Sequence, residues 1–140
     1  MKQERMDAAM RRIGRTHELL CRIPVAGAPM ARGLSWLLAV FPMLGGMRKS
    51  GSIEQTREML RASGEQMGFP FQISEIESDR FVLELPYCPY GFTRADQQRP
   101  CDTAMDMDRI MFRRCGAELT IEETIPGGAS RCRMRVRQRC

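Results

Sequence analysis

The sequence predicts an α+β fold, in which an antiparallel sheet of about four strands carries helices on one face. Apolar residues recur every three or four positions through the N-terminal half, which is the period of an amphipathic helix. In most of the C-terminal half they recur at every second position, which is the period of a half-covered strand. The expected order is α-α-α-β-β-α-β-β. The length of 140 residues suits a single domain, 1–140, with a helical part at 1–68 and a hairpin–helix–hairpin part at 69–140.

Three helices are expected before residue 69. The first spans Gln3 to Cys21. The second, Met30 to Leu44, is apolar on most sides, so we expect it in the core or along the interface of a homodimer. The third begins at Ser52, which forms a capping box with Gln55, and ends at Gly68, since glycine is favoured at helix C-termini.

Two hairpins and a fourth helix account for the C-terminal half. Alternating apolar residues over 69–87, with a turn at 77–80, predict the first hairpin. A polar loop follows at 88–100. Asp102 is expected to cap the next helix, which runs to about Cys115. Apolar residues at 117, 119 and 121, and at 132, 134 and 136, predict a second hairpin around a glycine-containing turn.

Composition and charge limit the cellular setting. The most apolar stretch, 33–44, is much shorter than the ~20 residues that cross a bilayer, so no membrane span is expected. The charged N-terminus is not followed by an apolar segment, which argues against a signal peptide. We therefore expect a cytoplasmic protein, in which the six cysteines are thiols.

Arginines alternate along the last strand, at 131, 133, 135 and 137, and the net charge is +5. Such a row could bind phosphates. However, Glu118 and Glu122 occupy the polar face of the partner strand and are expected to pair with it. No aromatic residues alternate with the arginines to stack on bases, so nucleic acid is not an expected partner.

Four cysteines of the C-terminal half are candidate metal ligands: Cys88, Cys101, Cys115 and Cys132. Twelve, thirteen and sixteen residues separate them, unlike the short paired spacings of zinc fingers. A fold can still bring distant thiolates together, and thiolates suit zinc, copper(I) and iron–sulfur clusters. Cys132 is in phase with Met134 and Val136, so packing in the core is the alternative for it.

Asp102 and Asp106 are candidate catalytic residues, together with Cys88 and Cys101. The two aspartates are four positions apart, on one face of the expected helix, where paired carboxylates can orient a water molecule. The structural alternative is that the helix dipole favours acids in the first turn and that arginines neutralise them. His17, the single histidine, is expected to pack on the inner side of the first helix.

Four segments in this order resemble the 2-amino-thiazoline-4-carboxylate hydrolase family: Tyr87-Cys-Pro-Tyr90, Cys101-Asp-x-x-x-Asp106, Glu122-Glu-Thr-Ile-Pro-Gly-Gly128 and Cys132-Arg-Met-Arg-Val136. The region is also similar to the iron–sulfur sensor half of cluster-assembly repressors, whose cysteines have nearly the same spacing. Both families are similar to a superfamily of 4-vinyl-reductase-type and haem-NO-binding domains, which often hold a small hydrophobic ligand.

The resemblance implies two alternative functions. The first is a sensor-like domain without a DNA-binding module, which binds a small ligand, or a soft metal ion or iron–sulfur cluster through the four cysteines. The second is a hydrolase of a small cyclic amidine such as 2-amino-thiazoline-4-carboxylate. There Cys88 or Cys101 would be nucleophile or metal ligand, and Asp102 and Asp106 would activate water or bind substrate nitrogen. The sequence favours the first, because it offers no complete set of base and nucleophile. The sequence is compatible with zinc, with an iron–sulfur cluster, or with no cofactor at all.

Overall fold

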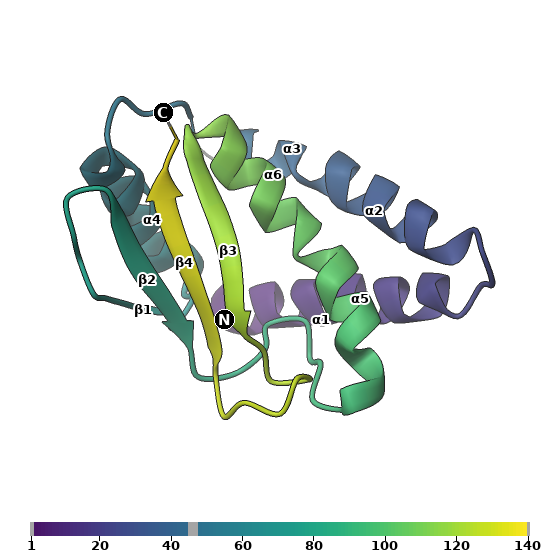
Figure 1. Ribbon diagram of the computed structural model, residues 1–140. Helices are drawn as coiled ribbons and strands as arrows, with labels where there is room; N and C mark the ends of the chain where they lie inside the picture. Colours follow the sequence, from purple (N-terminus) through teal and green to yellow (C-terminus); the bar gives the residue numbers. More distant parts are fainter. Residues whose placement is uncertain (1, 45–47, 140) are drawn as a thin grey trace.

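A four-stranded antiparallel sheet lies against helices on one of its faces (Figure 1). The computed structural model describes residues 2–44 and 48–139, so Cys140 lies outside the described residues. The predicted fold class and element order are confirmed. In chain order the elements are α1 (Lys2–Cys21), α2 (Gly27–Leu38), α3 (Val40–Leu44), α4 (Ile53–Met67), β1 (Gln72–Ser74), β2 (Arg80–Leu85), a 3-10 turn (Ala95–Gln97), α5 (Gln98–Ala104), α6 (Asp106–Arg114), β3 (Ala117–Glu123) and β4 (Cys132–Gln138).

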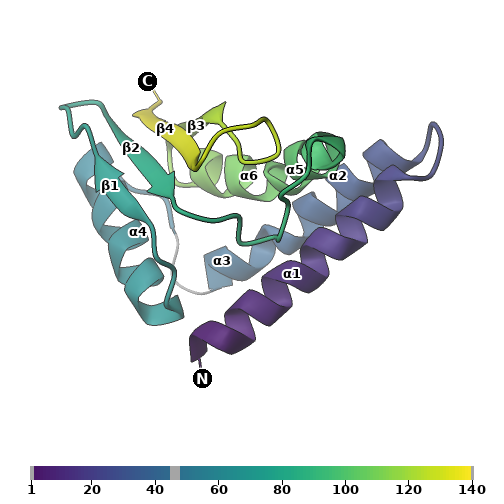
Figure 2. The same ribbon diagram turned by 90° about the horizontal axis from the view of Figure 1, so that it is seen from below.

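The strand order β1–β2–β4–β3 places the last strand in the middle of the sheet. Leu83 of β2 and Met134 of β4 are register partners, as are Leu119 of β3 and Val136 of β4. These positions are buried, and α4 and α6 pack their apolar side chains against them. Figure 2 shows α1 and the α2–α3 pair side by side, forming a second helical layer.

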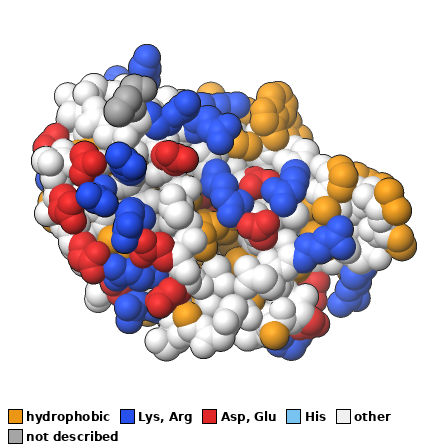
Figure 3. Space-filling view, viewed as in Figure 1, with side chains coloured by type: hydrophobic (Ala, Val, Ile, Leu, Met, Phe, Trp, Pro, Cys, Tyr) orange, Lys and Arg blue, Asp and Glu red, His pale blue; other side chains and the backbone are white. Residues whose placement is uncertain are grey.

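The other face of the sheet is charged, and Figure 3 shows its acidic and basic side chains interleaved over the strands. Arg133 donates to Glu75, Glu84 and Glu122 at 2.7, 2.8 and 2.9 Å. Arg131, Arg135 and Arg137 also have acidic partners. Of the two glutamates predicted to pair with this row, Glu122 does so. Glu118 has no ion pair within the described part of the chain.

Helix α4 begins and ends as the sequence predicts. The Ser52 hydroxyl accepts the N–H of Gln55 at 3.2 Å. The Gln55 side chain reaches one residue further back than a capping box requires, because it accepts the N–H of Gly51 at 2.9 Å. Gly68 ends the helix with φ of +76°, a left-handed conformation that glycine adopts without steric cost.

The second predicted helix is divided and begins earlier than expected. It starts at Gly27 and breaks at Ala39, after which α3 continues to Leu44. Small buried residues, among them Ala31 and Ser35, line its inner side against α1 and α5. The outer side is exposed, so only half of this apolar helix lies in the core.

The predicted cap at Asp102 is wrong. Helix α5 already begins at Gln98, and Asp102 lies inside it. Pro100 falls in the first turn of α5, where the missing N–H of proline has no helical partner to lose. The helix breaks at Met105 and resumes as α6, whose first turn holds Asp106. None of the helices in residues 2–44 and 48–139 is both long and apolar enough to cross a membrane.

Candidate thiol and carboxylate site

Three of the four predicted cysteines lie near one another at one end of the sheet. Cys88 and Cys101 are buried in one apolar cluster, which lies between the loop after β2, α5 and α1. Cys132, at the start of β4, is close enough for its charge to influence the pKa of Cys101. Cys115 is fully buried in a different cluster, between the sheet, α4 and α6. The fold therefore separates Cys115 from the other three.

A tight loop places backbone N–H groups near the Cys88 sulfur. The backbone N–H groups of Phe92, Tyr90 and Gly91 lie near enough to this sulfur to lower the pKa of the thiol, and the Gly91 N–H donates to the Cys88 carbonyl oxygen at 3.0 Å. Gly91 has φ of +81°, which turns the chain back over Cys88. The loop lies directly on α1, because a side chain at Gly14 would come within 2.2 Å of the Tyr90 carbonyl oxygen. Converging N–H groups form a concave site that favours a negatively charged atom.

Burial and the nearby N–H groups shift the pKa of the Cys88 thiol in opposite directions. Burial raises this pKa, and the three backbone N–H groups reduce that rise. Burial and the neighbouring Cys88 and Cys132 raise the pKa of Cys101 to about 12. Cys132 also has a raised pKa because of burial, although the backbone N–H of Ile125 partly offsets this rise. The three thiols are therefore protonated near neutral pH unless a cation replaces the protons.

Tyr90 and Asp108 add a polar pair to this cluster. The Tyr90 hydroxyl donates to Asp108 Oδ2 at 3.1 Å. Burial raises the pKa of Asp108 to about 6, and the hydrogen bond from Tyr90 works in the opposite direction. Asp108 was not among the candidates from sequence. Residues two positions apart point to opposite sides of a helix. The sequence could therefore have indicated that Asp108 and Asp106 have different neighbours.

Asp102 and Asp106 form an ionic network with two arginines. Arg109 donates to Asp102 at 2.8 Å and to Asp106 at 2.6 Å. Arg32 of α2 bonds the same two carboxylates. Partial burial alone would raise the pKa of Asp102, but Arg109 and Arg32 outweigh it and hold this pKa low. This network matches the structural alternative for the aspartates, since both are neutralised.

His17 occupies the packed position that was expected. It is fully buried, and its Nδ1 lies 3.0 Å from the Thr103 hydroxyl of α5. The Ser35 hydroxyl lies 3.4 Å from Nε2 but donates to the Thr103 carbonyl at 2.6 Å. Burial lowers the pKa of His17 more than the nearby Asp106 raises it. The histidine thus joins α1, α2 and α5 in its neutral form.

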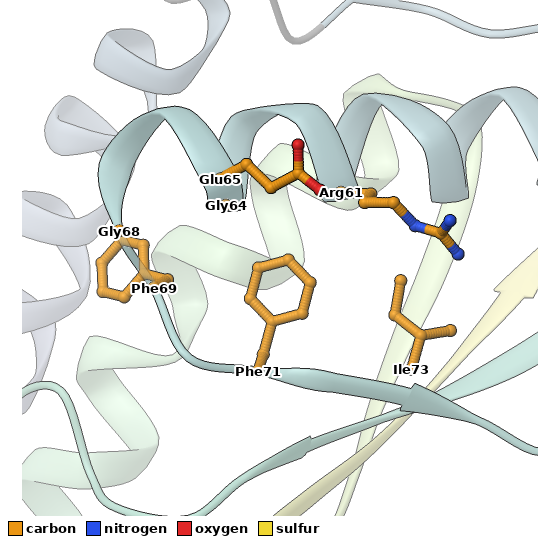
Figure 4. A pocket seen from close by; sticks show the side chains of 7 residues that line it. All are labelled: Arg61, Gly64, Glu65, Gly68, Phe69, Phe71 and Ile73. Carbon is orange, nitrogen blue, oxygen red and sulfur yellow. The ribbon is translucent and has the colours of Figure 1, made fainter.

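A groove of about 440 Å³ lies elsewhere, between α4 and β1 (Figure 4). Phe71 and Gly64 line it and pack closely together, since a Cβ added at Gly64 would lie only 2.1 Å from the Phe71 ring. Its polar side chains are Arg61 and Glu65, and it shares no residue with the thiol site. Within residues 2–44 and 48–139, no group of three or more His, Cys, Asp or Glu side chains is arranged to hold a metal ion.

Fold and site together define a small α+β domain with a cluster of thiols at one end of its sheet. Neither a protein-family model nor a curated protein matches the chain. The resemblances to the hydrolase family and to the iron–sulfur sensors therefore stay predictions.

Proposed function

We propose that this protein is a sensor-like binding domain for a soft metal ion, with Cys88 and Cys101 as ligands and Cys132 beside them. The loop at Cys88, in which the backbone N–H groups of Tyr90, Gly91 and Phe92 lie near one sulfur and lower the pKa of its thiol, carries the proposal. Donors of this kind stabilise a thiolate, which is the form of cysteine that binds soft ions. Reduced thiols persist in the cytoplasm, which is the proposed location.

The positions of the four cysteines favour binding of a single metal ion over binding of an iron–sulfur cluster held by all four. Iron–sulfur clusters take four protein ligands, and Cys115 lies in the sheet core, away from the other candidates. Copper(I) and zinc both accept sets of thiolates. Because the pKa values of Cys88, Cys101 and Cys132 are raised, metal binding displaces protons and is expected to strengthen as pH rises.

Metal titration under anaerobic conditions tests the proposal. Copper(I) and zinc are each titrated in competition with a chromophoric chelator, and ultraviolet absorption from thiolate-to-copper charge transfer reports binding. Cys88→Ser and Cys101→Ser are expected to lose the tightest site. Cys115→Ser is the matched control, since it replaces a buried thiol outside the site, and it should keep that binding. No binding by the wild type, or equal losses in all three variants, would reject the proposal.

The visible spectrum of anaerobically purified protein separates an ion from a cluster. A single zinc or copper(I) ion leaves the protein colourless, whereas an iron–sulfur cluster absorbs visible light. A visible chromophore that disappears in Cys88→Ser but persists in Cys115→Ser would replace the single ion by a cluster with a different fourth ligand.

Asp108 supports hydrolysis of a small cyclic amidine as the second candidate function. A carboxyl with a pKa of about 6 exchanges protons near neutral pH, and Asp108 adjoins Tyr90 and Cys88. Asp108→Asn is expected to abolish ring opening of 2-amino-thiazoline-4-carboxylate, while Asp106→Asn should retain it. A wild-type protein without this activity would reject the second candidate.

A further inference from the structure

The outer side of α2 and α3 forms an exposed apolar surface, which we call the α2–α3 face. It consists of Met30, Trp36, Leu37, Val40, Phe41 and Leu44. The exposed fractions of these residues range from 39% at Val40 to 77% at Leu44. Figure 3 shows hydrophobic side chains gathered where α2 and α3 reach the surface.

No free charge interrupts this face. Arg32 is the single charged residue between Gly27 and Leu44. Its guanidinium is bound to Asp102 and Asp106 and is thereby held at the border with α5 and α6. A second apolar surface can therefore cover the face without burying an unpaired charge.

The size of the face is close to what a dimer requires. The exposed fractions correspond to about 600 Å² of apolar surface, at the upper limit of the patches found on monomers. Leu19 near the end of α1 and Ile23 and Val25 in the α1–α2 turn are exposed as well. With them the area approaches the ~800 Å² that each partner buries in a standard interface.

We propose that the α2–α3 face is the interface of a homodimer, in which the α2–α3 helices of two copies pack antiparallel about Leu37. Positions 30, 33, 37, 41 and 44 are separated by steps of three or four residues, which place them on one side of packed helices. A two-fold axis makes such an interface self-complementary, because each copy contributes the same residues.

The antiparallel arrangement matches the shape of the face. Phe41 lies four positions after Leu37 and Gly33 four positions before it, so Phe41 of one copy meets Gly33 of the other. A Cβ added at Gly33 would meet nothing within 4 Å, so the surface there is open to a partner side chain. Met30 and Leu44, each seven positions from Leu37, become opposite one another in the same way.

A membrane surface is the competing occupant of an exposed apolar helix. Helices that lie in the membrane interface carry Lys and Arg on their polar side. In α2 the inner side is buried in the protein, and its one basic residue, Arg32, is already paired. These observations favour the second copy.

Sedimentation equilibrium and the fluorescence of Trp36, the single tryptophan, test the dimer together. The wild type is expected at twice the chain mass of 16.0 kDa. Its emission should move to longer wavelength on dilution, because dissociation exposes Trp36. Leu37→Glu should be monomeric, whereas Ile76→Glu, which changes an exposed apolar residue in the β1–β2 turn, should remain dimeric.

Gly33→Leu tests the antiparallel pairing itself. The added side chain has open space in the single chain and would occupy the place of the partner's Phe41. We expect the dimer dissociation constant to rise at least about tenfold, a change of a size that one buried contact supplies. Circular dichroism should show that the single chain stays folded.

Four results would overturn the proposed dimer or its pairing. A wild type that is monomeric at every concentration, or a Leu37→Glu variant that is dimeric, rejects the interface. A monomer whose Trp36 emission shifts on adding phosphatidylglycerol vesicles assigns the face to a membrane instead. A Gly33→Leu variant with unchanged dimerisation rejects the pairing about Leu37.

Discussion

The Tyr90 hydroxyl donates a hydrogen bond to Asp108 Oδ2 over 3.1 Å, which links the loop after β2 to helix α6. Burial raises the pKa of Asp108 to about 6, and the Tyr90 hydroxyl keeps it from rising further. Asp108 therefore changes charge in a pH range where an ordinary aspartate is already ionised. Its titration is measurable both as a stability effect and at the carboxyl group itself.

The free energy of unfolding should fall as pH rises from about 4 to about 6 by roughly 1–3 kcal/mol, relative to Asp108→Asn. In that window the folded state still holds the Asp108 proton, which the unfolded state has released. The folded state thus binds more protons, and raising the pH disfavours it. Urea unfolding of both proteins across this range measures the difference. Asp96→Asn, at an exposed carboxylate, should retain the wild-type profile.

Replacing Tyr90 by Phe should raise the pKa of Asp108 further. The variant removes a hydrogen bond that favours the ionised carboxylate and keeps the burial that disfavours it. Titration of the Asp108 carboxyl carbon by NMR gives the pKa directly. A lower pKa in Tyr90→Phe would show that the hydroxyl does not act as the donor.

His17 is expected to destabilise the protein as the pH falls below about 6.5. Its folded-state pKa is lowered by burial, although Asp106 partly offsets this, so the unfolded state takes up a proton first. His17→Gln should remove this acid-dependent loss. The comparison must be made between wild type and variant at each pH, because Asp108 acts with the opposite sign in part of the same range.

Arg109→Met should cost about 1–3 kcal/mol of stability, and Arg32→Met less than about 1 kcal/mol. Both remove a cation from Asp102 and Asp106. Arg109 is the less exposed of the two, at 30% against 49%, and it also donates to the backbone carbonyl of Asp102. Urea unfolding at neutral pH gives both values. Equal losses would mean that the two arginines share the network evenly.

Alanine at two helical glycines should have effects of opposite sign. At Gly64 the added Cβ would lie 2.1 Å from the Phe71 ring, so Gly64→Ala should destabilise the protein by about 1–3 kcal/mol. At Gly33 nothing lies within 4 Å, so Gly33→Ala should stabilise the single chain by roughly 0.5–1 kcal/mol through helix propensity. Both are measured in the Leu37→Glu background, so that dimerisation does not contribute. Equal effects would contradict the tight packing of Phe71.

Local patterns of the sequence predicted most of the elements and their order. The alternation over β3 and β4 and the signals at Ser52 and Gly68 act through neighbouring residues, so they can be recognised without the fold. The start of α5 was mispredicted because Asp102 has the chemistry of a cap but pairs with Arg32, which is distant in sequence. The sequence left open whether the apolar second helix lies in the core or at an interface, because its apolar pattern is the same in both cases; the structure shows that its outer side is exposed.

The sequence by itself determined the α+β class, the order of the elements and the cysteines and aspartates worth examining, because periodicity and capping are local properties. Only the tertiary structure decided which of these residues meet. It brings Cys88, Cys101 and Cys132 together, buries Cys115 in the sheet core, neutralises Asp102 and Asp106, and sets Asp108 beside Tyr90. The physical reason is that burial and charge pairing depend on contacts between elements far apart in the chain, which no local pattern encodes.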